Sequence, residues 1–243
     1  MVRRSPWMLR LTLGGAALKD LDPGLPGASV RLLVPSPGTR ELVVPAWTGN
    51  EFLLPGGRRP VIRTYTPLRH DPDAGELDLD VVIHQLGAVS AWAEAARPGD
   101  EAAVSGTGRG YSIDSDARLF LLAGDETAIP AISQLLGLVP DEADVEVVIE
   151  VAHPDARLPM PTHPRAQVTW VDLPAGAAPG DSLVAAVSEA DIDPEARIWV
   201  AGEAAAVHRI RRHLFEERGL ARRLTNVRGY WKHGRAGTGT DDG

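Results

Sequence analysis

The chain has 243 residues, of which 44% are apolar and 24% charged, with a net charge of −8 and no cysteine. The length favours two compact domains, and the lack of cysteine excludes disulfides, thiolate nucleophiles and cysteine-held zinc or iron–sulfur centres. An acidic surface argues against non-specific binding to nucleic acid. No apolar run approaches the length of about 18 residues that a membrane span needs. Polar residues and glycines interrupt the N-terminal stretch Leu9–Leu18, so it does not read as a signal peptide, and we predict a cytoplasmic protein.

The first half predicts short strands separated by glycine and proline turns. The expected strands, rich in Val, Leu, Ile and Thr, are Leu9–Leu13, Ser29–Val34, Glu41–Val44, Val61–Pro67, Glu76–His84 and Asp100–Ser105. One helix is expected at Ser90–Ala96. Six short strands joined by tight turns indicate a small antiparallel barrel, which we assign to residues 1–112.

In the second half of the chain, the spacing of the apolar residues changes from alternation to continuous runs. Nearly continuous apolar strands are expected at Arg118–Ala123 and Asp144–Val151, with similar ones at Gln167–Asp172 and Arg197–Ala201. Helical segments intervene at Thr127–Leu138, Asp181–Glu189 and Glu203–Arg218. Strands alternating with helices predict an open parallel sheet, so residues 113–243 are assigned to an α/β domain.

One local pattern with chemical meaning is Arg63-Thr64-Tyr65-Thr66, on a predicted strand. Strand alternation places Arg63 and Tyr65 on one face and Thr66 on the other. A flavin nucleotide needs these residue types: a guanidinium for its pyrophosphate, a flat aromatic beside its ring and a hydroxyl near the polar ring edge. An ordinary strand with an exposed arginine fits the same four residues about equally well.

Two kinds of glycine turn follow. Gly87-Ala88-Val89-Ser90 leads into the first helix, where free backbone N–H groups and a hydroxyl suit a phosphate, although a plain capped helix explains it as well. In the second half, Gly124-Asp125-Glu126-Thr127 and Gly202-Glu203 each follow a predicted parallel strand, where ligands of α/β sheets bind. Neither is a G-x-G-x-x-G fingerprint. The scattered histidines form no metal-binding motif, so no metal site is predicted.

In this order, the patterns resemble the siderophore-interacting proteins, a family of ferredoxin-reductase-like flavoproteins. The matching segments are Arg63–Arg69, His84 with Gly87 and Ser90–Ala93, Arg97–Asp100, Leu122–Ile132, Ala201–Glu203 and Gly229–Trp231, and together they cover nearly the whole chain. The family usually has glycine after the histidine and Gly-Pro-Ala before the serine. Gln85 and Gly87-Ala88-Val89 stand at those places here.

The resemblance implies a flavin-binding barrel followed by a nucleotide-binding α/β domain, with bound FAD. The residues it implies for FAD are Arg63, Tyr65, Thr66, Val82, His84, Val89, Ser90, Thr127, Tyr230 and Trp231. Those it implies for NADPH or NADH are Gly124, Asp125, Glu126, Gly202 and Glu203. For Trp231, a core or surface position is an equally good interpretation.

The activity implied is FAD-dependent reduction of a ferric siderophore, with NADPH or NADH as donor and a ferredoxin as an alternative donor. A siderophore- or flavin-binding protein without turnover and a general flavin reductase remain alternatives. Residues 208–235 hold nine basic and two acidic residues, a net charge of +7. Because many ferric siderophores are anionic, we expect Arg69, Lys232 and Arg235 to attract the substrate.

Overall fold

The computed structural model describes residues 1–84 and 87–234. They form two compact units, one over residues 1–110 and one over residues 111–233, and each is described by itself. In the part of the chain that is described, no helix is long and apolar enough to cross a bilayer.

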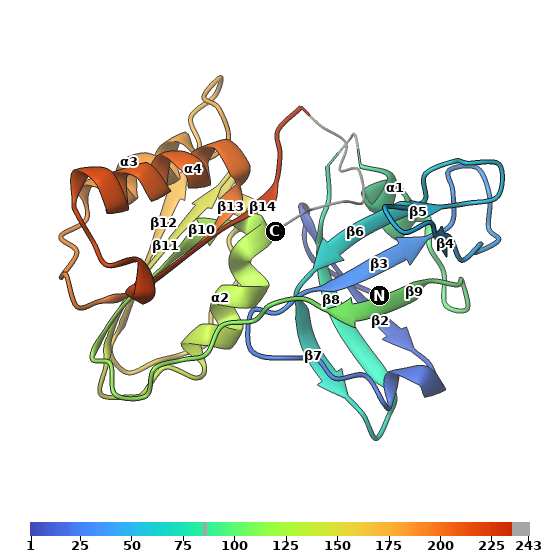
Figure 1. Cartoon of the computed structure of the whole chain (residues 1–243), viewed down its shortest axis with the longest axis horizontal. Coiled ribbons are helices and arrows are strands. Elements are labelled where there is room, and N and C mark those ends of the chain that lie inside the picture. The colour runs from blue at the N-terminus through green and yellow to red at the C-terminus, as the bar shows by residue number, and fades with distance from the viewer. Residues whose placement is uncertain (85–86, 235–243) are drawn as a thin grey trace. The chain divides into compact units, whose positions relative to one another are not determined.

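The first unit is built from antiparallel strands (Figure 1). One sheet has the order β1 (Val2–Ser5), β2 (Met8–Gly14), β8 (Glu76–Val82) and β7 (Pro67–Asp71). A second sheet has the order β6 (Val61–Tyr65), β3 (Val30–Val34) and β9 (Ala103–Thr107). The short strands β4 (Ala46–Trp47) and β5 (Phe52–Leu53) pair with each other, and α1 spans Ala88–Ala95.

Strand alternation explains the core of this unit. In the β2–β8 pair, Leu9 lies opposite Val81 and Leu11 opposite Leu79, and all four side chains are buried. The intervening pair on the other face is charged: Arg10 donates to both oxygens of Asp80 at 2.7 and 2.8 Å. The period of two therefore separates an apolar face from an ion-paired face.

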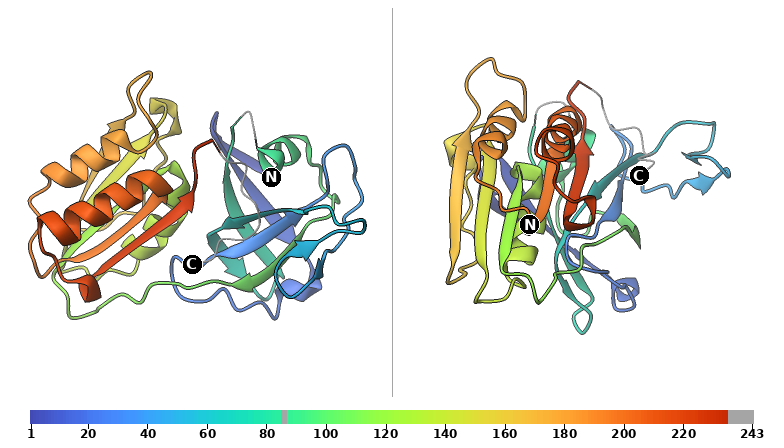
Figure 2. Two further views of the ribbon diagram at one scale, coloured as in Figure 1. Left: turned by 45° about the horizontal axis from the view of Figure 1, so that its top comes forward. Right: turned by 60° about the vertical axis from the view of Figure 1, so that its left-hand side comes forward.

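The second unit is a parallel sheet of five strands. Their order is β12 (Ala166–Asp172), β11 (Asp144–Val151), β10 (Leu119–Asp125), β13 (Arg197–Glu203) and β14 (Thr225–Trp231). Helix α2 (Ile129–Leu136) lies on one face of the sheet, and α3 (Asp181–Glu189) and α4 (Ala204–Arg212) lie side by side on the other (Figures 1 and 2). Within the predicted helical segment Glu203–Arg218, Val207, Ile210 and Leu214 are buried in the core of this unit.

The predicted fold class is confirmed: antiparallel sheets come first, and a parallel sheet with helices follows. Two details differ. The predicted strand Glu41–Val44 was wrong, because no described strand pairs with it and Val44 is 71% exposed. Strand β14 was not predicted, because its polar and glycine residues do not form an apolar run. As an edge strand it pairs with β13 alone.

Candidate functional site

The first candidate group lies at the end of β6. Arg63 and Tyr65 are two residues apart on this strand, and Thr66 is buried between β6 and β7. The Arg63 guanidinium donates to the carbonyl of Ile62 at 2.6 Å and forms no ion pair with a carboxylate of the described residues. Burial raises the pKa of the Tyr65 phenol above its ordinary value, and the positive charge of Arg63 opposes that rise. The two side chains therefore act on each other.

The Arg63 charge also reaches His84. Burial and the nearby guanidinium both lower the pKa of the His84 imidazole below 6.5, so the ring is neutral at pH 7. The structure thus brings together a strand residue and a residue beyond the end of β8, twenty-one positions apart. Val82 is the last residue of β8, two positions before the imidazole.

The turn between β8 and α1 is held by Ser90. Its buried hydroxyl donates to the carbonyl of Val82 at 3.1 Å and accepts from the backbone N–H of His84 at 3.4 Å. The hydroxyl proton is therefore used inside the unit. The helix begins at Gly87 without a side-chain cap, and its first-turn residue Val89 is buried.

Gly87 is closely packed in this turn. A Cβ at this position would lie 2.7 Å from the His84 ring and 2.9 Å from the Ser90 hydroxyl oxygen, closer than atoms pack. A guanidinium without a carboxylate partner, an uncapped helix start and a neutral imidazole are the donors that a flavin nucleotide's phosphates and ring require. The residues of this unit therefore fit FAD.

The second candidate group lies at the carboxyl edge of the parallel sheet. Strands β10 and β13 are neighbours, with Gly124 opposite Ala201, so the two predicted glycine turns meet. After β10, the next two strands of the chain, β11 and β12, are added on one side of it. The following two strands, β13 and β14, are added on its other side. Strand order therefore reverses between β10 and β13, which is where open α/β sheets hold their ligands.

Asp125 lies at the centre of this edge and is 4% exposed. One carboxylate oxygen accepts from the backbone N–H and the hydroxyl of Thr127, at 2.9 and 2.5 Å. The other accepts from the backbone N–H of Glu203 and the indole N–H of Trp231, at 2.9 and 2.8 Å. Burial raises the pKa of Asp125, and the four donated hydrogen bonds oppose that rise.

Three further carboxylates lie along this edge. Glu203 accepts from the backbone N–H groups of Ala205 and Ala206, and Glu126 accepts from that of Ala152. Burial, together with the charges of Asp125 and Glu150, raises the pKa of Glu126 to about 7. Glu150 is 3% exposed, and burial raises its pKa as well.

Comparison with known proteins gives the family. Residues 1–110 match the siderophore-interacting FAD-binding domain, and residues 117–234 match the siderophore-interacting protein model. The chain belongs to the siderophore-interacting protein family. The ferric vibriobactin reductase ViuB of Vibrio cholerae is 30% identical over 94% of this chain and 85% of its own length.

Two solved structures support the assignment to the siderophore-interacting family. A siderophore utilization protein from T. fusca is 34% identical, with a TM-score of 0.83 over 97% of this chain and 90% of its own. The siderophore-interacting protein SipS from Aeromonas hydrophila is 28% identical, with a TM-score of 0.75 over 94% of this chain and 93% of its own.

The basic residues expected to attract a siderophore differ in whether they are ion-paired. The Arg69 guanidinium forms ion pairs with Asp71, Glu76 and Asp78, at 3.2, 2.6 and 3.0 Å. Three carboxylates leave it little charge to offer an anion, so the structure argues against Arg69 as a docking residue. Lys232 is exposed and makes no ion pair within residues 1–84 and 87–234, whereas Arg235 lies outside the described residues.

The C-terminal aromatic residues of this siderophore-interacting protein lie on β14. Tyr230 packs edge-on against Trp199, with ring centroids 6.2 Å apart. Trp231 is 36% exposed, and its indole is fixed by the hydrogen bond to Asp125. The contacts that the sequence did not reveal are the indole bond to Asp125 and the hydrogen bonds of Glu150, because both join residues far apart in the chain.

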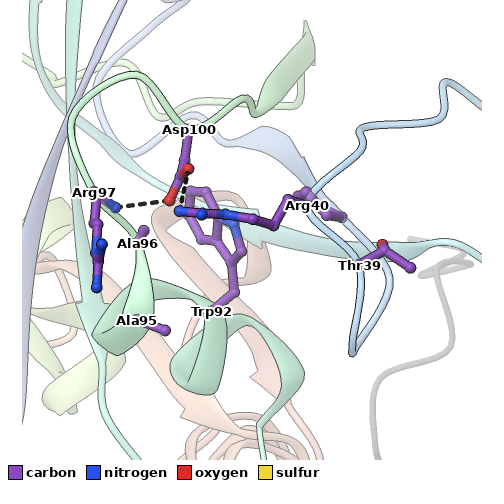
Figure 3. A pocket seen from close by; sticks show the side chains of 8 residues that line it. Thr39, Arg40, Trp92, Ala95, Ala96, Arg97 and Asp100 are labelled. Carbon is purple, nitrogen blue, oxygen red and sulfur yellow. Dashed lines mark hydrogen bonds and ion pairs between the residues drawn. The ribbon is translucent and has the colours of Figure 1, made fainter.

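A pocket of about 300 Å³ lies in the first unit, at the other end of α1 from the Gly87 turn. Figure 3 shows the Trp92 indole in this pocket beside the Arg40 side chain, which pairs with Asp100 at 3.1 Å. None of the residues predicted to bind FAD lines it. Asp100 also accepts from the backbone N–H of Arg97, which fixes the Arg97-Pro-Gly-Asp100 turn.

Proposed function

We propose that this protein binds FAD in its first unit and uses it to reduce ferric siderophores, releasing iron(II). The observation that carries the proposal is the Arg63 guanidinium, which has no described carboxylate partner and acts on both Tyr65 and His84 within a domain of the FAD-binding type. The relationship to a ferric vibriobactin reductase supports the reaction type.

In this proposal each residue of the first unit has a role. Arg63 and the backbone N–H groups at the start of α1, at Val89 and Ser90, hold the pyrophosphate. Tyr65 lies beside the ring system and Thr66 near its polar edge. Val82 and the neutral His84 line the ring or the ribityl chain. Ser90 acts mainly by fixing the turn, since its hydroxyl proton is donated to Val82.

The chemistry requires only electron transfer. Iron(III) is a hard cation held by oxygen ligands, and iron(II) is held less tightly by them, so one electron loosens the complex. Bound FAD supplies the ability to take an electron pair and return electrons singly. The protein's own contribution is to bind and orient the flavin, and no side chain has to act as general acid or base.

The family resemblance implies NADPH or NADH as the donor, with a ferredoxin as the alternative. Thr127, Tyr230 and Trp231 belong to the second unit, and their role in FAD binding stays a prediction from the resemblance. Gly124, Asp125, Glu126, Gly202 and Glu203 lie at the edge where a nicotinamide nucleotide would bind, but their carboxylates already accept from the N–H groups there. The residues of this edge do not fit a dinucleotide. We place the reaction in the cytoplasm, as expected from the composition.

The test uses the purified full chain with FAD, reduced by light so that no biological donor is involved. It is mixed anaerobically with a ferric siderophore, and flavin reoxidation and a coloured iron(II) chelate are followed together. We expect each reduced flavin to release two iron(II), one per electron. A reduced protein that stays reduced would favour a binding protein without turnover. Much faster reoxidation by free flavin than by the ferric complex would favour a flavin reductase.

A further inference from the structure

Three helices begin at the carboxyl edge of the parallel sheet, and a carboxylate accepts from one or two backbone N–H groups in or just before the first turn of each. Asp125 accepts from the Thr127 N–H at 2.9 Å, in the turn that leads into α2. Glu203 accepts from the N–H groups of Ala205 and Ala206, at 2.6 and 2.9 Å, at the start of α4. These N–H groups are the ones that bind phosphate in nucleotide-binding folds of this type.

The third helix start is filled from a neighbouring strand. Glu150, near the end of β11, accepts from the backbone N–H of Gly180 at 2.7 Å and from that of Leu183 at 2.8 Å, at the start of α3. Asp125, Glu150 and Glu203 are each at most 4% exposed. By contrast, no carboxylate among the described residues accepts from the backbone N–H groups at the start of α1 in the first unit. The helix starts of the two units differ in this respect.

The glycines of this edge serve contacts within the protein. In dinucleotide folds, glycine lets the pyrophosphate approach the backbone. A Cβ on Gly124 would lie 2.4 Å from the Cβ of Ala128, and one on Gly202 would lie 2.7 Å from the Asp125 carboxylate. Both glycines are therefore needed for close contacts within the protein at this edge.

The end of β14 and the residues after it also contact this edge of the sheet. The Trp231 indole donates to Asp125 at 2.8 Å, and the His233 backbone N–H donates to Glu203 at 3.1 Å. Both contacts are made to the two carboxylates that fill the starts of α2 and α4. A ligand at the point of strand reversal would have to displace this segment.

We propose that Asp125 and Glu203, with the segment Trp231–His233 that they hold, exclude a dinucleotide pyrophosphate from the α/β unit, and so determine which electron donor this protein accepts. The inference rests on the proposed function for its biological meaning: the donor reduces the flavin without docking a pyrophosphate on this sheet edge. NADPH and NADH then reduce the flavin only by collision.

Charge strengthens this exclusion. One ionised carboxylate about 4 Å from one phosphate charge weakens binding about a thousand-fold at an effective dielectric constant of about 20.

The test measures binding of ADP-ribose and 2′-phospho-ADP-ribose, which carry the pyrophosphate but cannot reduce flavin, to the FAD-loaded full chain by calorimetry. We expect no saturable binding by the wild type up to about 1 mM. Glu203→Gln keeps the shape and an acceptor oxygen but removes the charge. Asp125→Ser/Glu203→Ser also removes volume. We expect both variants to gain affinity, by at least about tenfold for the second.

Glu195→Ser is the matched control, because it removes an exposed charge near the opposite end of β13. Saturable wild-type binding below about 0.1 mM would overturn the proposal. So would the absence of any gain in a folded Glu203→Gln protein, which keeps the test valid if the double variant does not fold. Iron(II) release from the light-reduced protein involves no nucleotide, so the proposed function can fail or succeed separately.

Discussion

Replacing Arg63 by alanine tests the flavin site most directly. The guanidinium has one described hydrogen bond, to the Ile62 carbonyl, and no described carboxylate depends on it. Its removal therefore leaves no unpaired buried charge, and the unit should stay folded. A hydrogen bond between charged groups contributes about 1.5–3 kcal/mol, so the Kd for FAD should rise about 10- to 150-fold.

The same variant has a second readout that does not involve flavin. Because the Arg63 charge helps to lower the pKa of His84, the pKa in the apoprotein should move back toward 6.5 when the charge is removed. Flavin affinity is measured by the quenching of FAD fluorescence, and the imidazole is titrated by NMR.

Arg31→Ala is the control for this experiment. Arg31 is exposed on the neighbouring strand β3, where it lies opposite Thr64 and so on the other face of the sheet from Arg63. Unchanged FAD affinity in Arg63→Ala, or an equal loss in Arg31→Ala, would refute the assignment of the phosphate-binding role to Arg63.

Three further predictions concern the turn, the acidic edge and the substrate. Gly87→Ala should weaken FAD binding at least about tenfold with the fold retained, because the new Cβ would lie 2.7 Å from the His84 ring; a fluorescence titration measures it. Glu126 has a folded-state pKa of about 7 against 4.5 unfolded, so its contribution to stability is fully present below pH 4.5 and is lost as the pH rises through 7. Glu126→Gln should flatten that slope and stabilise the protein at pH 8 by at most about 3 kcal/mol, measured by urea unfolding at both pH values. Lys232→Ala/Arg235→Ala should weaken binding of an anionic ferric siderophore most at low salt, because attraction is screened over about 8 Å at physiological ionic strength.

Each of these three predictions has a control or an outcome that would contradict it. Gly14→Ala places a Cβ where no other atom lies within 4 Å, so it should leave FAD binding unchanged. Parallel pH profiles for the wild type and Glu126→Gln would contradict the raised pKa. An unchanged affinity and salt dependence in the double variant would place the docking surface elsewhere.

Local pattern was enough to predict much of the fold. Asp144–Val151 and Asp181–Glu189 were predicted with the bounds that the structure gives to β11 and α3, because an apolar run and a helical stripe are encoded in consecutive residues. Strand β14 was missed for the complementary reason: an edge strand bonded on one side does not need a continuous apolar run.

The candidate site also has a part that the sequence could predict and a part that it could not. The sequence by itself placed Arg63 and Tyr65 on one strand and the glycine turns after parallel strands, since both follow from spacing along the chain. Tertiary structure decided which groups those turns bind. Asp125 and Trp231 are 106 positions apart, and Glu150 lies 30 positions before the Gly180 N–H that it accepts from. The periodicity of the sequence predicts whether a residue is buried. It does not predict the hydrogen-bond partners of a buried carboxylate, because these are the backbone N–H groups that the tertiary structure places beside it. In this protein those partners are the helix starts that a nucleotide would otherwise bind.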